Sequence, residues 1–354
     1  MRGGMESGAP LSMPPRMHDK ERNEWSMNKK ERLMAVLNHQ KPDRIPVGFW
    51  FHFEGEQARG DACVQAHVNY YRESGIDFIK IMSDELGYPL RTTISCAADW
   101  RNVEPLPKDD PFFEKTVERC AAINAIVGDE CYTFYNFFSP FNIVRACDVF
   151  TPEALQGRSW DETVMAHLRE DPDALRHALN VIAGDLAILA ERVIREGGCL
   201  GIYQSLQGAE KGRMSREEYD SVVKPSDMIV INAFNAVSSY NILHMCSWAG
   251  FPNDLSYWKD YPCRVKNWGT GVEELSIWDG ISYFGSDTVL LGGLDNRRDY
   301  PLYCGNKEQV QQEVRNVLAH MGDTPFILGA DCTVPNTIDL DHIRWVIEAL
   351  EAGL

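Results

Sequence analysis

Short apolar runs, each followed by a polar turn and then by a longer stretch with helical spacing, recur along most of the chain. Eight runs are rich in β-branched or aromatic residues, and they cover residues 45–51, 77–82, 131–137, 199–205, 241–246, 263–269, 287–293 and 325–330. The clearest helical patterns cover residues 172–197, 215–238, 305–321 and 338–352. Near-continuous apolar strands that alternate with helices indicate a parallel sheet covered by helices. Eight such units favour a closed (β/α)8 TIM barrel over an open α/β sheet.

The domain organisation follows from the segments outside this alternation. Residues 1–26 mix Gly, Pro, Ser and charged residues without periodicity, and we interpret them as a flexible leader. Residues 83–130 are too long for one loop and one helix, which indicates an insertion over the mouth of the barrel. Because no linker composition divides the remainder, residues 27–354 are predicted to form a single domain.

The composition limits which classes of partner the protein can bind and which cellular compartment it is expected to occupy. The formal net charge of −17 argues against nucleic acid and anionic membranes as partners, because both require clustered Lys and Arg. The chain has no apolar run long enough to span a membrane and no signal-peptide pattern, so we expect a cytoplasmic protein. Its 10 cysteines are scattered, which predicts free thiols apart from any that bind a metal or act in catalysis.

The active site of a barrel lies at the carboxyl ends of its strands, which we call the mouth. Residues two apart on a strand point to the same face, so His244 and Cys246 can point together into this mouth, where Cys332 follows the eighth strand. One imidazole and two thiolates suit Zn²⁺, and three protein ligands with an open fourth position are typical of a catalytic site. The alternative is that the thiols are small buried hydrophobes and the histidine is hydrogen-bonded in the core.

Other polar residues near the predicted strand ends are candidates for catalysis or substrate binding. Asp84 could stabilise a cation or accept a proton, or it could simply cap the next helix. His52 is flanked by aromatic residues that could form a pocket wall, although a lone histidine is often structural. Candidates for binding a substrate are Asn136, Gln204, Gln207, Trp268 and Asp295; a tight turn is an equally good explanation of the segment that contains Asp295.

Together these features resemble the uroporphyrinogen decarboxylase superfamily over nearly all of residues 27–354. The resemblance rests on the segments "NKKERLMAVLNHQKPDRIPV", "SDELGYP", "NILHMC", "GGLDN" and "ILGADCTVPNTIDLDHIRWVIEAL". It implies a (β/α)8 barrel, which is often dimeric in this superfamily, and it leaves two branches to consider.

The decarboxylase branch binds an acidic tetrapyrrole without a metal, using an arginine-bearing segment after the first strand and an aspartate after the second. Asp84 matches that aspartate. The first-strand end reads "FWFHFEGEQARG" and lacks the arginine-rich pattern, and "GADC" replaces a histidine that is usual near the last strand. A substrate with many carboxylates needs cations that these positions do not supply, so both departures count against this chemistry.

The other branch comprises zinc methyltransferases that move a methyl group between a corrinoid protein and an acceptor such as coenzyme M. His244, Cys246 and Cys332 match their zinc ligands residue by residue. The resemblance therefore implies Zn²⁺, methylcobalamin carried by a partner protein, and a small methyl acceptor of the thiol or tetrahydrofolate type. Asp84 and His52 would be catalytic. The alternatives are decarboxylation of a tetrapyrrole by Asp84 and a non-catalytic barrel that binds a corrinoid or tetrapyrrole.

Overall fold

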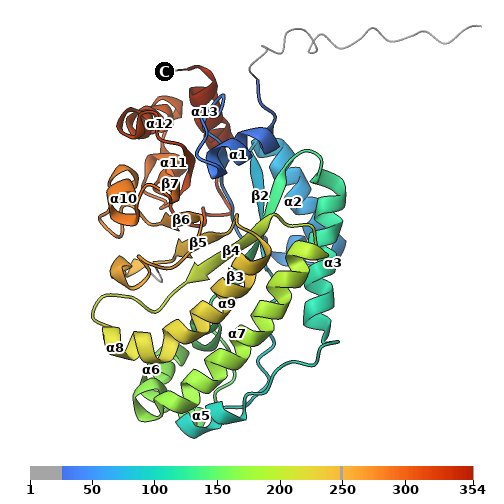
Figure 1. Ribbon diagram of the computed structural model, residues 1–354, viewed down its shortest axis with the longest axis vertical. Helices are drawn as coiled ribbons and strands as arrows, with labels where there is room; N and C mark the ends of the chain where they lie inside the picture. The colour runs from blue at the N-terminus through green and yellow to red at the C-terminus, as the bar shows by residue number, and fades with distance from the viewer. Residues whose placement is uncertain (1–25, 248–249, 354) are drawn as a thin grey trace, which may run out of the picture.

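The eight apolar runs form one parallel sheet that curls into a nearly closed barrel (Figure 1). The computed structural model describes residues 26–247 and 250–353, and nearly all of the predicted leader lies outside them. The order of the strands in the sheet is β1-β8-β7-β6-β5-β4-β3-β2, which confirms the predicted (β/α)8 fold. The strands are β1 Val47–Gly48, β2 Phe78–Ile81, β3 Tyr132–Phe138, β4 Gly201–Leu206, β5 Ile242–Met245, β6 Val265–Trp268, β7 Val289–Leu294 and β8 Phe326–Ala330.

The two edges of the sheet, β1 and β2, meet through one buried carboxylate. The Asp77 backbone N–H donates to the Val47 carbonyl (2.9 Å), and the Val47 N–H donates to the Asp77 carboxylate (2.8 Å). The same carboxylate accepts from Arg32 (2.7 Å) and Arg44 (2.8 Å). At this junction between β1 and β2, which we call the seam, the contacts of Asp77 take the place of the ladder of hydrogen bonds that joins the other neighbouring strands.

Helices surround the sheet, and the four clearest helical patterns of the sequence are all helical. The helices are α1 Lys29–Leu37, α2 Gly60–Ser74, α3 Pro111–Val127, α4 Pro140–Arg145, α5 Pro152–Leu155, α6 Trp160–Glu170, α7 Pro172–Arg195, α8 Arg216–Glu218, α9 Lys224–Val237, α10 Ile277–Phe284, α11 Pro301–Cys304, α12 Lys307–Met321 and α13 Leu340–Glu351. A π-helical turn, Tyr219–Val223, joins α8 to α9. No helix within the described residues is both long enough and apolar enough to cross a bilayer.

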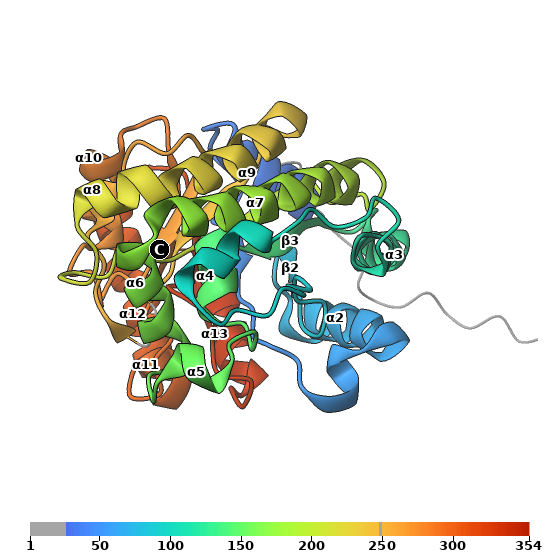
Figure 2. The same ribbon diagram turned by 90° about the horizontal axis from the view of Figure 1, so that it is seen from below.

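Two segments add structure near the mouth. Residues 83–110 are irregular apart from the 3₁₀ helix Ala97–Asn102, so they form the extra segment that the length of 83–130 predicts. They contact the short helices α4 to α6, which the sequence analysis did not anticipate: Ile94 bridges to Phe150, and the Trp100 indole donates to His167 (3.1 Å). Helices α5, α6 and α8 lie at the end toward which β4 and β5 point (Figures 1 and 2).

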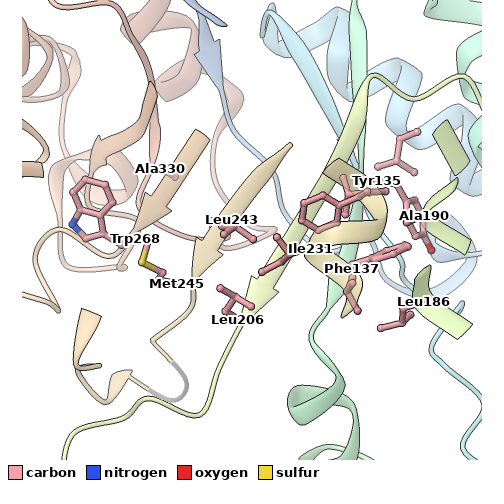
Figure 3. Packing of buried hydrophobic residues seen from close by; sticks show 14 of the residues in the cluster. Tyr135, Phe137, Leu186, Ala190, Leu206, Ile231, Leu243, Met245, Trp268 and Ala330 are labelled. Atoms are coloured by element: carbon pink, nitrogen blue, oxygen red, sulfur yellow. The ribbon is translucent and has the colours of Figure 1, made fainter. Parts of the chain in front are cut away.

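The buried side chains form an inner cluster and an outer cluster. The inner cluster fills the barrel, where Trp50 packs on Tyr203, and it includes residues of α1, which closes the other end. The outer cluster lies between strands and helices; Figure 3 shows Leu206 and Leu243 of the strands facing Ile231 of α9. Alternate residues of a strand belong to opposite clusters. Only the residues on the inner side of a strand can therefore direct their side chains to the mouth.

Candidate metal centre

His244, Cys246 and Cys332 come together at the mouth. His244 Nε2 lies 3.3 Å from Cys332 Sγ, and the three potential ligand atoms all lie within 4.8 Å of one another. A tetrahedral zinc ion with bonds of about 2.0–2.3 Å places its ligand atoms about 3.5–3.8 Å apart. The donor set therefore fits zinc with small adjustments, and it leaves one coordination position for another ligand.

Backbone contacts position Cys246 beyond the end of β5. Its N–H donates to the Leu206 carbonyl (3.0 Å), so the chain continues alongside β4 after the last residue of β5. The Asn253 amide donates to the Cys246 carbonyl (3.2 Å) and also to Glu273 (2.7 Å). These hydrogen bonds tie the loop that carries the Cys246 thiol to the end of β4 and, through Glu273, to the segment after β6.

Asp331 positions Cys332. This buried carboxylate accepts from Thr270 Oγ1 (2.6 Å) and from the Gly293 N–H (3.1 Å). Gly293 has φ of +103°, a conformation that favours glycine and that accounts for part of the "GGLDN" segment. Burial raises the pKa of Asp331 to about 6. The Asp331 side chain thus joins the ends of β6, β7 and β8 at the residue that precedes Cys332.

The surroundings favour a thiolate at this site. A hydrogen bond from the Cys246 thiol, the neighbouring His244 and the positive charge of Lys80 together hold the pKa of Cys332 well below its usual range, although burial opposes them. A low thiol pKa favours metal binding, because the thiolate is the form of cysteine that binds a metal.

Lys80, which the sequence analysis did not select, is buried inside the barrel on β2. Its Nζ lies 3.7 Å from the ring centroid of Tyr203 and 4.9 Å from that of Trp50. Burial lowers the pKa of Lys80 to about 7, while the charges of Cys332, Cys246 and Asp84 act in the opposite direction. The signal in the sequence was a lysine within the apolar run "DFIKIM", because a buried strand rarely contains an unpaired charge.

Asp84 and His52, the predicted catalytic residues, lie together at the mouth. Asp84 Oδ1 is 2.6 Å from His52 Nδ1, and Asp84 Oδ2 accepts from the Phe53 N–H (2.8 Å). The His52 side chain is 47% exposed, whereas that of Asp84 is 10% exposed. The carboxylate thus orients an imidazole that remains accessible to a ligand.

Asn136 and Gln207 have the orientation that substrate binding requires. Asn136 belongs to the inward-facing set of β3, and its amide nitrogen donates to Ser83 Oγ (3.1 Å). Its buried Oδ1 accepts no hydrogen bond within the described residues. Gln207 lies beside Cys246. Their role in binding a substrate stays a prediction.

Trp268 and Gln204 point away from the mouth, so the prediction that they bind substrate there is wrong. The Trp268 indole donates to the Leu275 carbonyl (2.8 Å) and packs against Phe284 of α10, within the outer cluster that Figure 3 shows. Gln204 lies in register between Phe137 and Leu243, which are both in the outer cluster. Strand alternation turns both side chains toward the helices.

Gln204 provides a test of this assignment. Its side chain is fully buried, and neither amide atom has a hydrogen-bond partner in the described part of the chain. Replacing it with leucine is expected to raise the free energy of unfolding by about 1–2 kcal/mol, because an unpaired buried amide costs about that much. Urea denaturation measures the change. A loss of stability would show that the amide makes a hydrogen bond that matters.

Asp295 lies to one side of the thiol cluster. It forms an ion pair with Arg297 (2.6 Å) and lines a pocket of about 320 Å³ that also contacts Tyr300 and Glu313. None of the three potential metal ligands lines this pocket. Substrate binding by Asp295 stays a prediction, and the structure places that residue in a separate pocket.

The family follows from a comparison with known protein families. The family model described as uroporphyrinogen decarboxylase (URO-D) matches residues 153–352, which is more than half of the 354-residue chain. The chain belongs to the URO-D family. The match includes β4 to β8 and therefore all three potential metal ligands of this URO-D family member. A comparison with curated protein sequences gives no significant match.

Several solved structures share the fold. A methyltransferase from Methanosarcina mazei is similar with a TM-score of 0.67 and 16% identity, covering 92% of this chain and 99% of that chain. A putative vitamin-B12 independent methionine synthase from Listeria monocytogenes has a TM-score of 0.51 and 12% identity, covering 87% of this chain and 96% of that one. A B12-independent methionine synthase from Shewanella has a TM-score of 0.51 and 10% identity, covering 88% and 94%. At these identities the likeness concerns the fold.

Proposed function

We propose that this URO-D family protein is a zinc-dependent methyltransferase. It would move a methyl group between a corrinoid carried by a partner protein and an acceptor of the thiol or tetrahydrofolate type. The observation that carries the proposal is the convergence of His244, Cys246 and Cys332 at the barrel mouth. The fold that the protein shares with a methyltransferase supports it.

The three convergent side chains would hold the zinc ion. When bound, zinc supplies Lewis acidity, which lowers the pKa of a thiol or similar acceptor at the fourth position. The His52 imidazole, oriented by Asp84, can take up the proton that such an acceptor releases. Lys80 places a positive charge near both cysteine sulfurs, where it offsets part of the negative charge of the thiolates.

A second candidate function is decarboxylation of a tetrapyrrole or a related acid. It is favoured by the position of Asp84, whose carboxylate lies at the end of β2 with little exposure. Two buried or half-buried arginines do not favour it, because Arg145 and Arg213 already form ion pairs with Asp161 and Glu210. Cations for a substrate with many carboxylates are therefore less available.

Methyl transfer tests the proposal directly. Zinc-loaded protein is incubated anaerobically with methylcobalamin and either a small thiol or tetrahydrofolate, and the methylated acceptor is quantified by mass spectrometry. We expect a methylated product whose formation is lost in Cys332→Ser and retained in Cys304→Ser, which changes an exposed cysteine. Equal transfer by Cys332→Ser, or no transfer to either acceptor, would contradict the proposal.

The alternatives give different results. Conversion of uroporphyrinogen to coproporphyrinogen that is lost in Asp84→Asn but retained in Cys332→Ser would support decarboxylation. Tight corrinoid or tetrapyrrole binding without turnover would support a carrier. A corrinoid-protein partner is a further proposal that follows from this function. A homodimer and a cytoplasmic location are also proposed, the first from the family resemblance and the second from the sequence composition.

A further inference from the structure

Gln207 connects the metal centre to a buried group of charges outside it. The residue follows β4, where the inward-facing positions are Tyr203 and Ser205, so alternation brings its side chain to the mouth. The residue is 4% exposed. It lies beside the Cys246 thiol, because the Cys246 N–H donates to the carbonyl of Leu206, the residue before Gln207.

Arg145 determines the direction in which the Gln207 side-chain amide points. Arg145 Nη1 lies 3.4 Å from Gln207 Oε1. A guanidinium can only donate hydrogen bonds, so it fixes the amide oxygen on its own side. This orientation leaves the amide NH2 group available to donate to the neighbouring Cys246 sulfur.

Arg145 is itself held firmly. Its side chain has no exposed surface, and it donates to Asp161 (2.8 Å) of α6 and to Glu210 (2.6 Å) of the β4–α8 loop. Two carboxylates thus keep the guanidinium in one position. A series of contacts thus connects Asp161 and Glu210, through Arg145 and Gln207, to the Cys246 sulfur.

We propose that Gln207, oriented by Arg145, is a positioning residue that holds the Cys246 sulfur in ligand geometry and draws negative charge from it. The inference rests on the proposed function, because it assumes that Cys246 binds the metal. Hydrogen bonds from outer residues orient metal ligands and tune the metal, and their loss costs about 10–100-fold in metal affinity. Gln207 therefore acts on the metal centre through Cys246.

The test compares Gln207→Leu and Gln207→Glu with Gln204→Leu. Both Gln207 variants lack the N–H donor, and the second keeps the shape of the side chain. We expect each to bind zinc about 10–100-fold more weakly in a chelator competition. Gln204→Leu removes the same residue type from the opposite face of the strand segment, and we expect it to bind zinc with the affinity of the unmodified protein. Urea denaturation checks that all variants are folded.

A spectroscopic measurement separates this role from a general structural one. In Co²⁺-substituted protein, the sulfur-to-cobalt charge-transfer band reports the electron density on sulfur. Without the N–H donor, that density rises, so the band of both Gln207 variants is expected to move to longer wavelength. If the unmodified protein binds metal and the variants show the same affinity and band, the Gln207 inference fails while the metal site stands. If the unmodified protein binds no zinc, the proposed function fails first.

Discussion

Cys332→Ser is expected to lose zinc when the purified protein is dialysed against a moderate chelator. A serine hydroxyl remains neutral at pH 7, whereas the cysteine gives a thiolate whose formation the site favours. Loss of a direct ligand should weaken zinc binding by at least about 100-fold, which is the upper range for loss of an outer hydrogen bond. Chelator competition gives the dissociation constant, and metal analysis gives the zinc content per chain.

The controls for this prediction come from the same chain. Cys246→Ser should give a loss similar to that of Cys332→Ser, since both sulfurs belong to one cluster. Cys304→Ser changes an exposed cysteine outside the cluster and should retain zinc at full affinity. Retention of zinc by both cluster variants would show that the metal binds elsewhere.

Asp77→Ala is expected to produce the largest loss of stability. Asp77 is fully buried, and its carboxylate joins β1 to β2 while pairing with Arg32 and Arg44. Removing the Asp77 carboxylate takes the buried counter-charge from Arg44 and leaves Arg32 with Asp43 alone. Removal of one partner of a buried ion pair typically costs about 3–5 kcal/mol. The free energy of unfolding from urea denaturation measures the effect.

The matched control for Asp77 is an ion pair on the surface. Lys41 and Asp323 are 2.8 Å apart, but their side chains are 78% and 91% exposed. Asp323→Ala should leave the unfolding midpoint unchanged within error, because exposed pairs contribute little. A similarly small effect of Asp77→Ala would mean that the carboxylate does not hold the seam.

The order of strands and helices could be predicted from the sequence because each strand is a distinct apolar run between turns. The direction of individual side chains could not. Strands of a parallel barrel are buried on both faces and show no alternation of polar and apolar residues. Gln204 and Trp268 therefore looked like strand-end candidates, although both belong to the outward-facing set. For His244 and Cys246, the sequence could predict that both side chains share a face, because residues two apart do so in either phase. The structure shows that this shared face meets Cys332.

The supporting contacts of the site were beyond sequence reasoning for a different reason. Arg145 lies on a short helix of an added segment, and its contact with Gln207 joins positions 62 residues apart. The sequence around Arg145 does not predict a contact with Gln207, and the sequence around Gln207 does not predict one with Arg145. Lys80 did carry a local signal, a charge inside an apolar strand. The rings next to its ammonium group are distant in sequence, since Trp50 follows β1 and Tyr203 belongs to β4.

X-ray absorption spectroscopy at the zinc edge of the purified full chain tests the central claim most directly. The proposed centre predicts about one zinc per chain with two sulfur neighbours at about 2.3 Å and at least one nitrogen at about 2.0–2.1 Å. One sulfur neighbour should disappear in Cys332→Ser protein examined at saturating zinc. A first shell of oxygen and nitrogen alone, or a protein that takes up no zinc under metal-replete conditions, would contradict the proposed centre.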